Sequence, residues 1–183
     1  MITLYVGKSA AGKDTFFHKM VSCGIKPVVS YTTRPMRVGE VDGVDYHFTD
    51  RESFSEKVSA GEIFEYRSYQ TNFNGKKDVW YYGSPKVNPA EDYVAITDIQ
   101  GAKAYINEYG SENLTIVYVY CEDEERKRRA MLRGSFSIDE WERRATDDEV
   151  KFNLETIGEL VKLLGKPITL LNNTGDKPAF STI

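Results

Sequence analysis

Short apolar runs alternate with amphipathic segments along most of the chain, and this alternation predicts strands followed by helices. Helices are predicted over "GAKAYINEYG", which ends at Gly110, from about 124 to 133, and from 138 to 164, where Gly165 would cap the end. The pattern is typical of an α/β fold with a parallel sheet core flanked by helices. The short apolar runs that predict its buried strands are 2–6, the pair Val28–Val29, 93–98, 114–121 and 168–171.

The amino-acid composition changes between residues 31 and 84. This segment is rich in Tyr, Phe, Gly and charged residues, and it predicts a short amphipathic helix from Glu52 to Ala60 together with hairpins. Asn74 and Gly75 form a strong turn signal. We interpret residues 31–84 as a mixed α/β lobe inserted into the α/β core.

A glycine-rich stretch, "GKSAAGKDT", joins the first predicted strand to a helix. Gly7, Gly12 and Lys13 match the pattern G-x-x-x-x-G-K of a phosphate-binding loop, and the strand before and helix after are the context that this pattern requires. Its backbone N–H groups can form an anion site at a helix N-terminus, and Lys13 can neutralise the outer phosphates of a nucleoside triphosphate. The predicted ATP-binding residues here are Gly7, Lys8, Ser9, Ala10, Ala11, Gly12, Lys13, Asp14 and Thr15.

The position after Lys13 departs from the pattern, which expects Ser or Thr and finds Asp14. One interpretation is helix chemistry, since an acidic residue is favoured in a first helical turn. The other is that Asp14 meets Mg²⁺, a hard cation that takes oxygen ligands. Adenylate-kinase-like enzymes resemble this loop, because they also lack a hydroxyl directly after the lysine and carry Thr one place later, as Thr15 does here. The predicted metal ligand is therefore Asp14 or Thr15.

Composition and charge limit which binding partners and which cellular compartment we expect for this protein. The chain has 183 residues, a net charge of −4 and two cysteines, Cys23 and Cys121, without metal-ligand spacing. An acidic balance disfavours a nucleic-acid binder, and two distant cysteines disfavour a disulfide framework or a zinc site. No apolar run approaches the ~20 residues that cross a bilayer. Because the loop motif begins at residue 7, we expect no signal peptide, no membrane partner and a cytoplasmic protein.

A second anion site is predicted in "SYTTRPMRVGEVDGVDYHF", residues 30–48. Arg34 and Arg37 offer planar forks for phosphate oxygens, and Ser30 and Tyr46 offer hydroxyl groups. Taken singly, the arginines could be solvated and the tyrosines packed in strands. Their clustering between two core strands favours a site for a phosphorylated acceptor.

The same segment carries a family resemblance. Residues 32–48 match T-T-R-x-x-R-x-G-E-x-x-G-x-D-Y-x-F, a pattern that resembles the signature of guanylate kinases, at every fixed position. "GEIFEY", "YYGS" and "DIQG" follow in the family's order, and "RGSFSIDEWERR" is similar to the family's lid, with Ser135 in place of the usual Thr. The resemblance covers about residues 3 to 175.

The resemblance implies a fold and a reaction. The fold would be a P-loop NTPase-type single domain over 1–183, with a core at 1–30, 85–125 and 150–183, a GMP-binding lobe at 31–84 and a small helical lid at about 126–149. The reaction would be in-line transfer of the γ-phosphoryl of ATP to GMP or dGMP. By position, the acceptor's phosphate would be held by Ser30, Arg34, Arg37, Tyr46 and Tyr82, and its guanine would be read by Glu65, Ser84 and Asp98.

The chemistry of guanine supports Glu65 as the base reader. Guanine presents two adjacent donors, N1–H and the 2-amino group, and one carboxylate accepts both. Adenine has an acceptor at N1 and no 2-amino group, so it would leave Glu65 charged and unpaired, a mismatch that discriminates by ~10⁴.

A dense charge run, "EDEERKRRAMLRG", occupies residues 122–134. Most of it is predicted to be a solvated helix face, because acidic and basic residues stand four apart, as in Glu122/Arg126 and Glu125/Arg129. The resemblance implies that three arginines contact the transferring phosphates and act with Lys13 and Mg²⁺: Arg129, Arg133 and Arg144. It also implies that Asn172, or its neighbour Asn173, approaches the donor base.

Three departures from the family pattern leave rival interpretations open. They are Asp14, Ile96 in place of an acidic residue in "VAITDIQG", and the long segment 66–80. The rivals are an interaction module that has lost transfer, and a kinase on the same scaffold for another phosphorylated acceptor. The loop glycines, Lys13 and the lid arginines favour an active kinase. We expect the protein to be a monomer or a homodimer.

Overall fold

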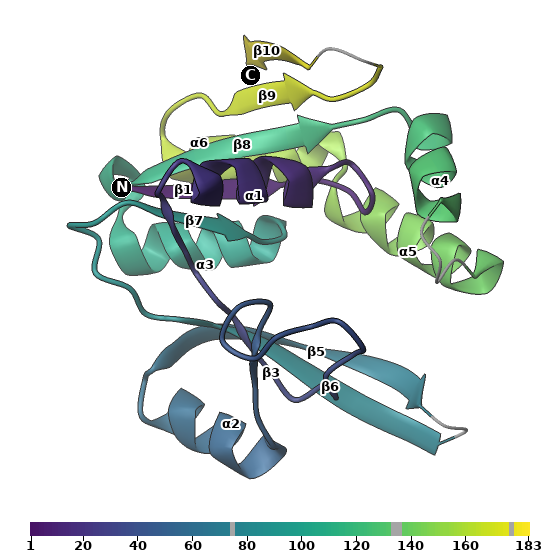
Figure 1. Ribbon diagram of the computed structural model, residues 1–183. Helices are drawn as coiled ribbons and strands as arrows, with labels where there is room; N and C mark the ends of the chain where they lie inside the picture. The colour runs from purple at the N-terminus through teal and green to yellow at the C-terminus, as the bar shows by residue number, and fades with distance from the viewer. Residues whose placement is uncertain (74–75, 133–136, 176–177) are drawn as a thin grey trace. The chain divides into compact units, whose positions relative to one another are not determined.

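The computed structural model describes residues 1–73, 76–132, 137–175 and 178–183 (Figure 1). The chain divides into two compact units. The first comprises Met1–Pro27 and Pro89–Ile183, and the second comprises Val28–Asn88. The phosphate-binding loop belongs to the first unit, and the segment 30–48 with its arginines belongs to the second.

A six-stranded sheet organises the first unit. Its neighbouring strands pair in parallel, except that β10 runs antiparallel to β9. The predicted parallel sheet is thus confirmed, but the strand predicted at Val28–Val29 is wrong, because β2 occupies Lys26–Pro27 instead. β10 was not predicted because all four of its residues are exposed and give no apolar pattern. From edge to edge the strands are β10 (Ala179–Thr182), β9 (Thr169–Asn172), β8 (Leu114–Tyr120), β1 (Ile2–Val6), β7 (Tyr93–Ile96) and β2 (Lys26–Pro27).

Helices cover both faces of this sheet, as predicted. The chain passes from β1 through α1 (Lys13–Ser22) to β2, and from β7 through α3 (Ile99–Tyr109) and the short η1 (Ser111–Asn113) to β8. These two connections run in opposite directions across the strand order, so right-handed crossovers place α1 and α3 on opposite faces. The helix α6 (Leu154–Leu164) contacts α3, on the face away from α1 (Figure 1).

The core under α1 explains why these segments become strand and helix. Tyr5, Val94, Val117, Val119 and Leu171 are buried on the sheet, and apolar side chains of α1 pack against them. The strand residues are mainly β-branched, which suits a pleated surface buried on both faces. Packing against this core fixes the start of α1, and with it the end of the glycine-rich loop.

The single helix predicted from 138 to 164 is wrong. The chain forms α5 (Ile138–Lys151) and then α6, separated by Phe152 and Asn153. Asn153 caps α6 by accepting a hydrogen bond from the Thr156 N–H at 2.9 Å. Phe152 has a non-helical backbone conformation and a buried side chain, and the centroid of its ring lies 6.2 Å from that of Tyr118. Burial of this ring and the new cap at Asn153 together favour the break between the helices. The preceding helix, α4, spans Asp123–Met131.

The second unit is a four-stranded sheet with one helix. The strand order is β4 (His47–Phe48), β3 (Tyr31–Thr32), β6 (Lys76–Pro85) and β5 (Ile63–Phe73). The helix α2 (Arg51–Ser59) is capped by Asp50, whose carboxylate accepts from the Ser53 N–H, and it buries Phe54. β5 and β6 form a long antiparallel hairpin, as predicted within residues 31–84, and the turn predicted at Asn74 and Gly75 lies outside the described residues.

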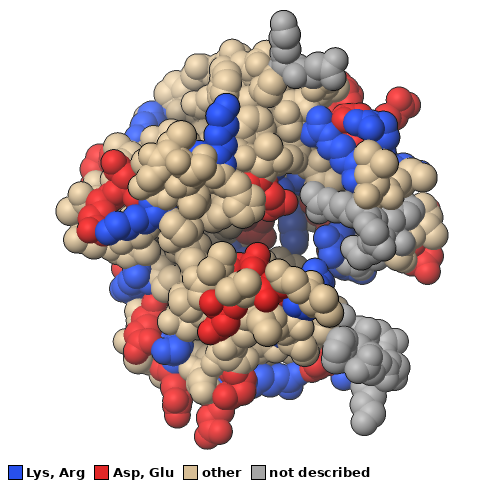
Figure 2. Space-filling model, viewed as in Figure 1, with Lys and Arg blue, Asp and Glu red and all other residues tan. Residues whose placement is uncertain are grey.

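Charge is dispersed over the visible surface. In Figure 2, acidic and basic side chains are interspersed on both units, and over α4 the two signs lie together. Cys23 is exposed and Cys121 is buried, and both are free thiols. In the described part of the chain, no helix has the length and apolarity to cross a membrane. Because the described residues on the surface visible in Figure 2 form no extended basic patch, we expect phosphate to be bound by a few individually positioned side chains and not by a broad positive surface.

Candidate functional site

The glycine-rich loop connects the end of β1 to the first turn of α1. Gly7 and Gly12 have φ values of 146° and 98°, in the region that favours glycine. A Cβ at Gly7 would collide with the carbonyl oxygen of Val119, and one at Gly12 would collide with the side-chain amide of Asn173. Gly7 is therefore required by a backbone neighbour as well as by its backbone angle, whereas Gly12 is required by its backbone angle, because the Asn173 side chain can shift.

The side chain of Lys13 folds back over the loop. Its ammonium donates to the carbonyl oxygens of Gly7, at 2.8 Å, and Lys8, at 2.9 Å. The cation is thus held at the concave side of the loop, where the phosphates of a nucleotide would need it. Asp14 and Thr15 follow in the first turn of α1 with exposed side chains.

Arg129 and Asn173 close the far end of the loop. Arg129 donates through one terminal nitrogen to the Asn173 carbonyl at 2.8 Å, and Asn173 donates from its side-chain amide to the Ala11 carbonyl at 2.8 Å. The predicted ligand Asn172 is exposed instead, and its side-chain oxygen accepts from the Thr174 N–H at 3.0 Å. Of the two asparagines considered, Asn173 is the one whose side chain touches the loop.

Glu125 fixes the orientation of Arg129. Its carboxylate accepts from Nε of Arg129 at 2.7 Å and from Nε of Arg128 at 2.7 Å. Hydrogen bonds from Arg128 and then Arg129 lower the pKa of Glu125 from 4.5 to about 2. The predicted pair Glu125/Arg129 is confirmed, and it positions a cation beside the phosphate-binding loop.

This lowered pKa predicts a pH dependence. A carboxyl whose pKa is lower in the folded state stabilises the fold at pH values above its unfolded pKa, near 4.5, and that stabilisation disappears as the pH falls toward 2. We expect Glu125→Gln to lower the free energy of unfolding at pH 6, and the difference from the parent protein to shrink steadily between pH 4.5 and 2. Urea unfolding across this range measures it, and a difference that is constant with pH would contradict it.

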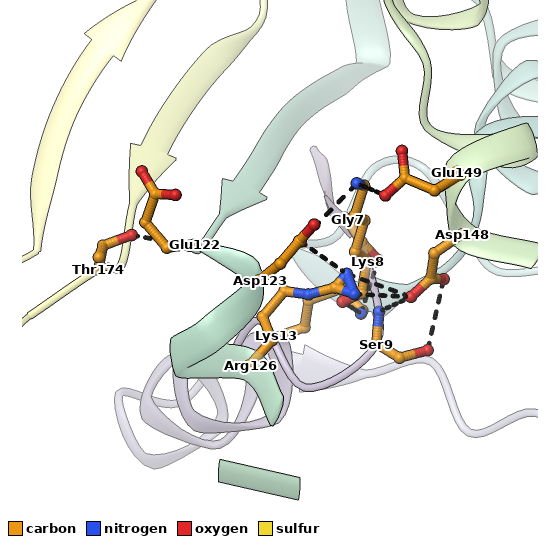
Figure 3. A network of polar contacts seen from close by, with 10 residues as sticks. All are labelled: Gly7, Lys8, Ser9, Lys13, Glu122, Asp123, Arg126, Asp148, Glu149 and Thr174. Carbon is orange, nitrogen blue, oxygen red and sulfur yellow. Dashed lines mark hydrogen bonds and ion pairs between the residues drawn. The ribbon is translucent and has the colours of Figure 1, made fainter. Parts of the chain in front are cut away.

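A buried ion-pair network supports the first half of the loop (Figure 3). Asp148 of α5 accepts from the Ser9 backbone N–H at 2.7 Å, and Arg126 of α4 lies 3.5 Å from the same carboxylate. Arg126 is 1% exposed, reaches Asp123 at 3.6 Å and lies over the ring of Trp141. The prediction that Arg126 belongs to a solvated face is wrong, because α5 packs over it, which spacing within α4 cannot reveal.

Lys8 is held from both helices as well. Its ammonium pairs with Glu149 of α5 and lies 3.9 Å from Asp123 of α4 (Figure 3). This pair lowers the pKa of Glu149, chiefly through the hydrogen bond from Lys8. Two acidic residues of α5 that the sequence analysis did not single out therefore hold the loop, Asp148 through the Ser9 backbone and Glu149 through the Lys8 side chain.

The network predicts a stability effect. Asp148→Asn keeps an oxygen that can accept from the Ser9 N–H but removes the charge opposite buried Arg126, so we expect a loss of about 3 kcal/mol in the free energy of unfolding. Asp147→Asn is the matched control, because Asp147 is half exposed and pairs with Arg143 on the same helix; its expected change is about 0.5 kcal/mol or less. Equal losses for the two variants in urea unfolding would contradict a buried pair.

In the second unit, Arg34 is the centre of a polar and aromatic cluster. It is 3% exposed and makes two hydrogen bonds to the Glu40 carboxylate, at 3.0 and 2.7 Å. Its guanidinium lies over the rings of Tyr46 and Phe48, at 5.4 and 5.6 Å. The hydrogen bond from Arg34 holds the pKa of Glu40 below its usual value.

Arg37, Tyr46 and Tyr82 lie close to this cluster. The backbone N–H of Arg37 donates to Glu40 at 2.7 Å, while its side chain is exposed. Tyr82 of β6 lies with its ring 5.8 Å from that of Tyr46. The structure thus brings Arg34, Arg37, Tyr46 and Tyr82 together. The backbone of Ser30 lies beside β4, since its carbonyl accepts from the His47 N–H at 2.9 Å, and this contact does not place the Ser30 hydroxyl in the cluster.

Glu65 and Ser84 are direct partners across the β5–β6 hairpin. The Ser84 hydroxyl donates to Glu65 Oε1 at 2.7 Å, and both side chains are largely buried. Arg67, two residues further along β5, forms an ion pair with Glu65 Oε2 at 3.1 Å. Sequence reasoning missed Arg67, although the two-residue period of a strand places it on the face that carries Glu65.

Three further predicted site residues, Asp98, Arg144 and Arg133, are not part of the contacts described so far. Asp98 begins α3 in the first unit, where its carboxylate accepts from the Gly101 N–H at 2.8 Å. Arg144 lies on α5 with an exposed side chain, and Arg133 lies outside the described residues.

Oxygen ligands for a metal are sparse at the loop. Across residues 1–73, 76–132, 137–175 and 178–183, no group of three or more His, Cys, Asp or Glu side chains is placed to hold an ion. Asp14 and Thr15 supply one carboxylate and one hydroxyl beside the loop. This donor set fits Mg²⁺ that is held mainly by nucleotide phosphates and water, because Mg²⁺ keeps several waters and needs only one or two protein oxygens.

Comparison with known proteins identifies the family. The guanylate kinase family model matches residues 3–133, which is well over half of the chain. The chain belongs to the guanylate kinase family. It is 35% identical to a guanylate kinase of Clostridioides difficile strain 630 over 152 residues, 79% of this chain and 70% of that one. It is 36% identical to one from Vibrio cholerae over 141 residues, 74% of this chain and 67% of that one.

A solved guanylate kinase shares the fold. The crystal structure from Anaplasma phagocytophilum aligns with a TM-score of 0.55 and 22% identity, covering 90% of this chain and 82% of that one. This likeness confirms the α/β fold of the guanylate kinase family. The family resemblance stated from residues 32–48 is thereby confirmed by independent matches over most of the chain.

Proposed function

We propose that this member of the guanylate kinase family transfers the γ-phosphoryl group of ATP to GMP or dGMP. An oxygen of the acceptor phosphate forms a bond to the γ-phosphorus while the bond from that phosphorus to the β–γ bridging oxygen breaks, which leaves ADP and a guanine nucleoside diphosphate. The observation that carries the proposal is the Ser84–Glu65 pair at 2.7 Å, in the unit that also contains Arg34, Tyr46 and Tyr82.

Phosphoryl transfer asks a protein mainly for alignment and for positive charge around the transferring group. On the donor side, the backbone N–H groups of residues 7–15 and the Lys13 ammonium would hold the β- and γ-phosphates. Arg129 lies beside the loop and would neutralise charge that develops between donor and acceptor, together with Arg133 and Arg144 of the lid. Asn172 or Asn173 would lie near the donor base.

Mg²⁺ is proposed as the cofactor, with Asp14 or Thr15 as its protein ligand. When bound, Mg²⁺ would neutralise charge on the donor phosphates. The exposed positions of Asp14 and Thr15 in the first turn of α1 support both assignments equally.

On the acceptor side, Ser30, Arg34, Arg37, Tyr46 and Tyr82 would bind the phosphate of GMP. Arg34 directs its fork at the Glu40 carboxylate, and this two-bond geometry supports a role in binding an anionic group. Glu65 and Ser84 would read the guanine, with Asp98 as a third reader. We propose a cytoplasmic enzyme, monomeric or homodimeric, without a nucleic-acid or membrane partner.

The decisive experiment offers the purified protein ATP, Mg²⁺ and one acceptor at a time from GMP, dGMP, AMP, CMP and UMP, and separates the products. Diphosphate formed from GMP or dGMP alone supports the proposal. Transfer to another monophosphate would favour a different acceptor on the same scaffold. GMP binding without any transfer would favour an interaction module.

A further inference from the structure

Arg67 stands beside the carboxylate that is proposed to read guanine, and the reaction described above gives it no role. Its terminal nitrogen Nη1 lies 3.1 Å from Glu65 Oε2 and donates to the Tyr66 carbonyl at 2.7 Å. We propose that Arg67 is a specificity-determining residue that donates a hydrogen bond to O6 of the guanine base. The inference rests on the proposed function, since it names a contact within the same acceptor site.

The strand pairing places the polar side chains of Ser84, Glu65 and Arg67 in a row, with Tyr82 beside them. Glu65 pairs with Ser84 across β5 and β6, and Arg67 pairs with Tyr82, so all four project from the same face of the hairpin. Glu65 Oε1 accepts from Ser84 at 2.7 Å, and Oε2 faces Arg67. The carboxylate is therefore flanked by a donor at each end, with the hydroxyl on one side and the guanidinium on the other.

This row complements the edge of guanine. Along that edge guanine presents O6 as an acceptor, N1–H as a donor and the 2-amino group as a donor. The matching protein edge needs one donor followed by two acceptors. Arg67 followed by the two oxygens of Glu65 supplies that order, whereas adenine, with a 6-amino donor and an N1 acceptor, opposes it at both positions.

Accessibility and chemistry favour Arg67 as the partner of O6. The Arg67 side chain is 32% exposed, so it can be reached by a ligand, whereas Ser84 is 6% exposed and already donates to Glu65. A guanidinium is the side-chain group that most often donates to guanine O6 in specific recognition. The ion pair with Glu65 and the bond to the Tyr66 carbonyl orient it before the base binds, which reduces the entropy lost on binding.

The test changes Arg67 and the 6-position of the base together. Arg67→Ala is assayed with GMP, with IMP, which keeps O6 and lacks the 2-amino group, and with 6-thio-GMP, whose sulfur is a weak acceptor. We expect kcat/KM for GMP and IMP to fall together by ~10- to 100-fold, and that for 6-thio-GMP by less than ~3-fold. Arg67→Lys should recover part of the preference for GMP over 6-thio-GMP, because an ammonium can still donate.

A control variant and a comparison variant complete the experiment. Arg51→Ala removes an exposed arginine of the same unit, which pairs with Asp78, and should leave the GMP to 6-thio-GMP ratio unchanged. Ser84→Ala is made in parallel. If Arg67→Ala leaves the ratio unchanged and Ser84→Ala abolishes it, O6 is read by Ser84 and the inference is overturned.

Calorimetric binding of the same nucleotides separates this inference from the proposed function. A parent protein that fails to phosphorylate GMP overturns the proposed function. If the same protein still binds GMP more tightly than 6-thio-GMP, and Arg67→Ala removes that difference, the assignment of Arg67 stands. Binding that ignores the 6-position in both proteins overturns it.

Discussion

Replacing Lys13 by alanine is expected to lower kcat/KM for phosphoryl transfer from ATP to GMP by ~10³-fold. The ammonium lies on the concave side of the loop, where it donates to the carbonyl oxygens of Gly7 and Lys8. Removing it takes away a fixed positive charge from the proposed triphosphate site, and water cannot replace a preorganised cation there. Steady-state assays with saturating GMP and varied ATP measure the loss.

The matched control for Lys13 is Lys19→Ala, an exposed lysine in the last turn of the same helix. It should keep turnover within about twofold of the parent, since surface charges away from a site contribute little. GMP binding, measured without ATP, should be unchanged in Lys13→Ala. Full turnover by Lys13→Ala would refute the phosphate-binding loop as the donor site.

Glu65→Gln is the second large effect. The amide keeps the size of the carboxylate but offers one oxygen and one N–H₂ group to a guanine edge that presents two donors. It also removes the negative charge that pairs with Arg67. We expect kcat/KM for GMP to fall by ~10²- to 10³-fold and that for AMP to change little, so that discrimination between them collapses.

Glu62→Gln serves as the control for Glu65. Glu62 is exposed and forms a surface pair with Lys57, so its loss should leave base discrimination intact. Thermal unfolding of both variants checks that neither has lost its fold. A Glu65→Gln protein that still prefers GMP over AMP by the parent's ratio would show that guanine is read by other residues.

Local patterns predicted the parts of the protein that depend on neighbours in sequence. Apolar strands alternating with helices gave the parallel sheet, and the spacing of Gly7, Gly12 and Lys13 gave the loop between β1 and α1. The pair Glu125/Arg129 followed from positions four apart on a helix. In each case the interaction lies within one element or one turn, so the order of residue types is enough to identify it.

Contacts between distant elements were decided only by tertiary packing. Arg126 looks like a surface residue within α4, yet α5 buries it against Asp148 and Trp141. Asn173 reaches Ala11 of the loop across more than 160 positions of sequence. The break at Asn153 depends on burial of Phe152 against Tyr118, which no helical period predicts.

The sequence by itself determined the fold class, the glycine-rich loop between β1 and α1, and the family, because those rest on local spacing and on a long ordered motif. Tertiary structure decided which charges are buried and which side chains share a face. The guanidinium of Arg67 lies beside Glu65 because strand pairing fixes β5 against β6, and Asp148 supports Ser9 because α5 folds back onto the loop. Burial and partners arise from elements far apart in the chain, and the energy of a charge depends on both.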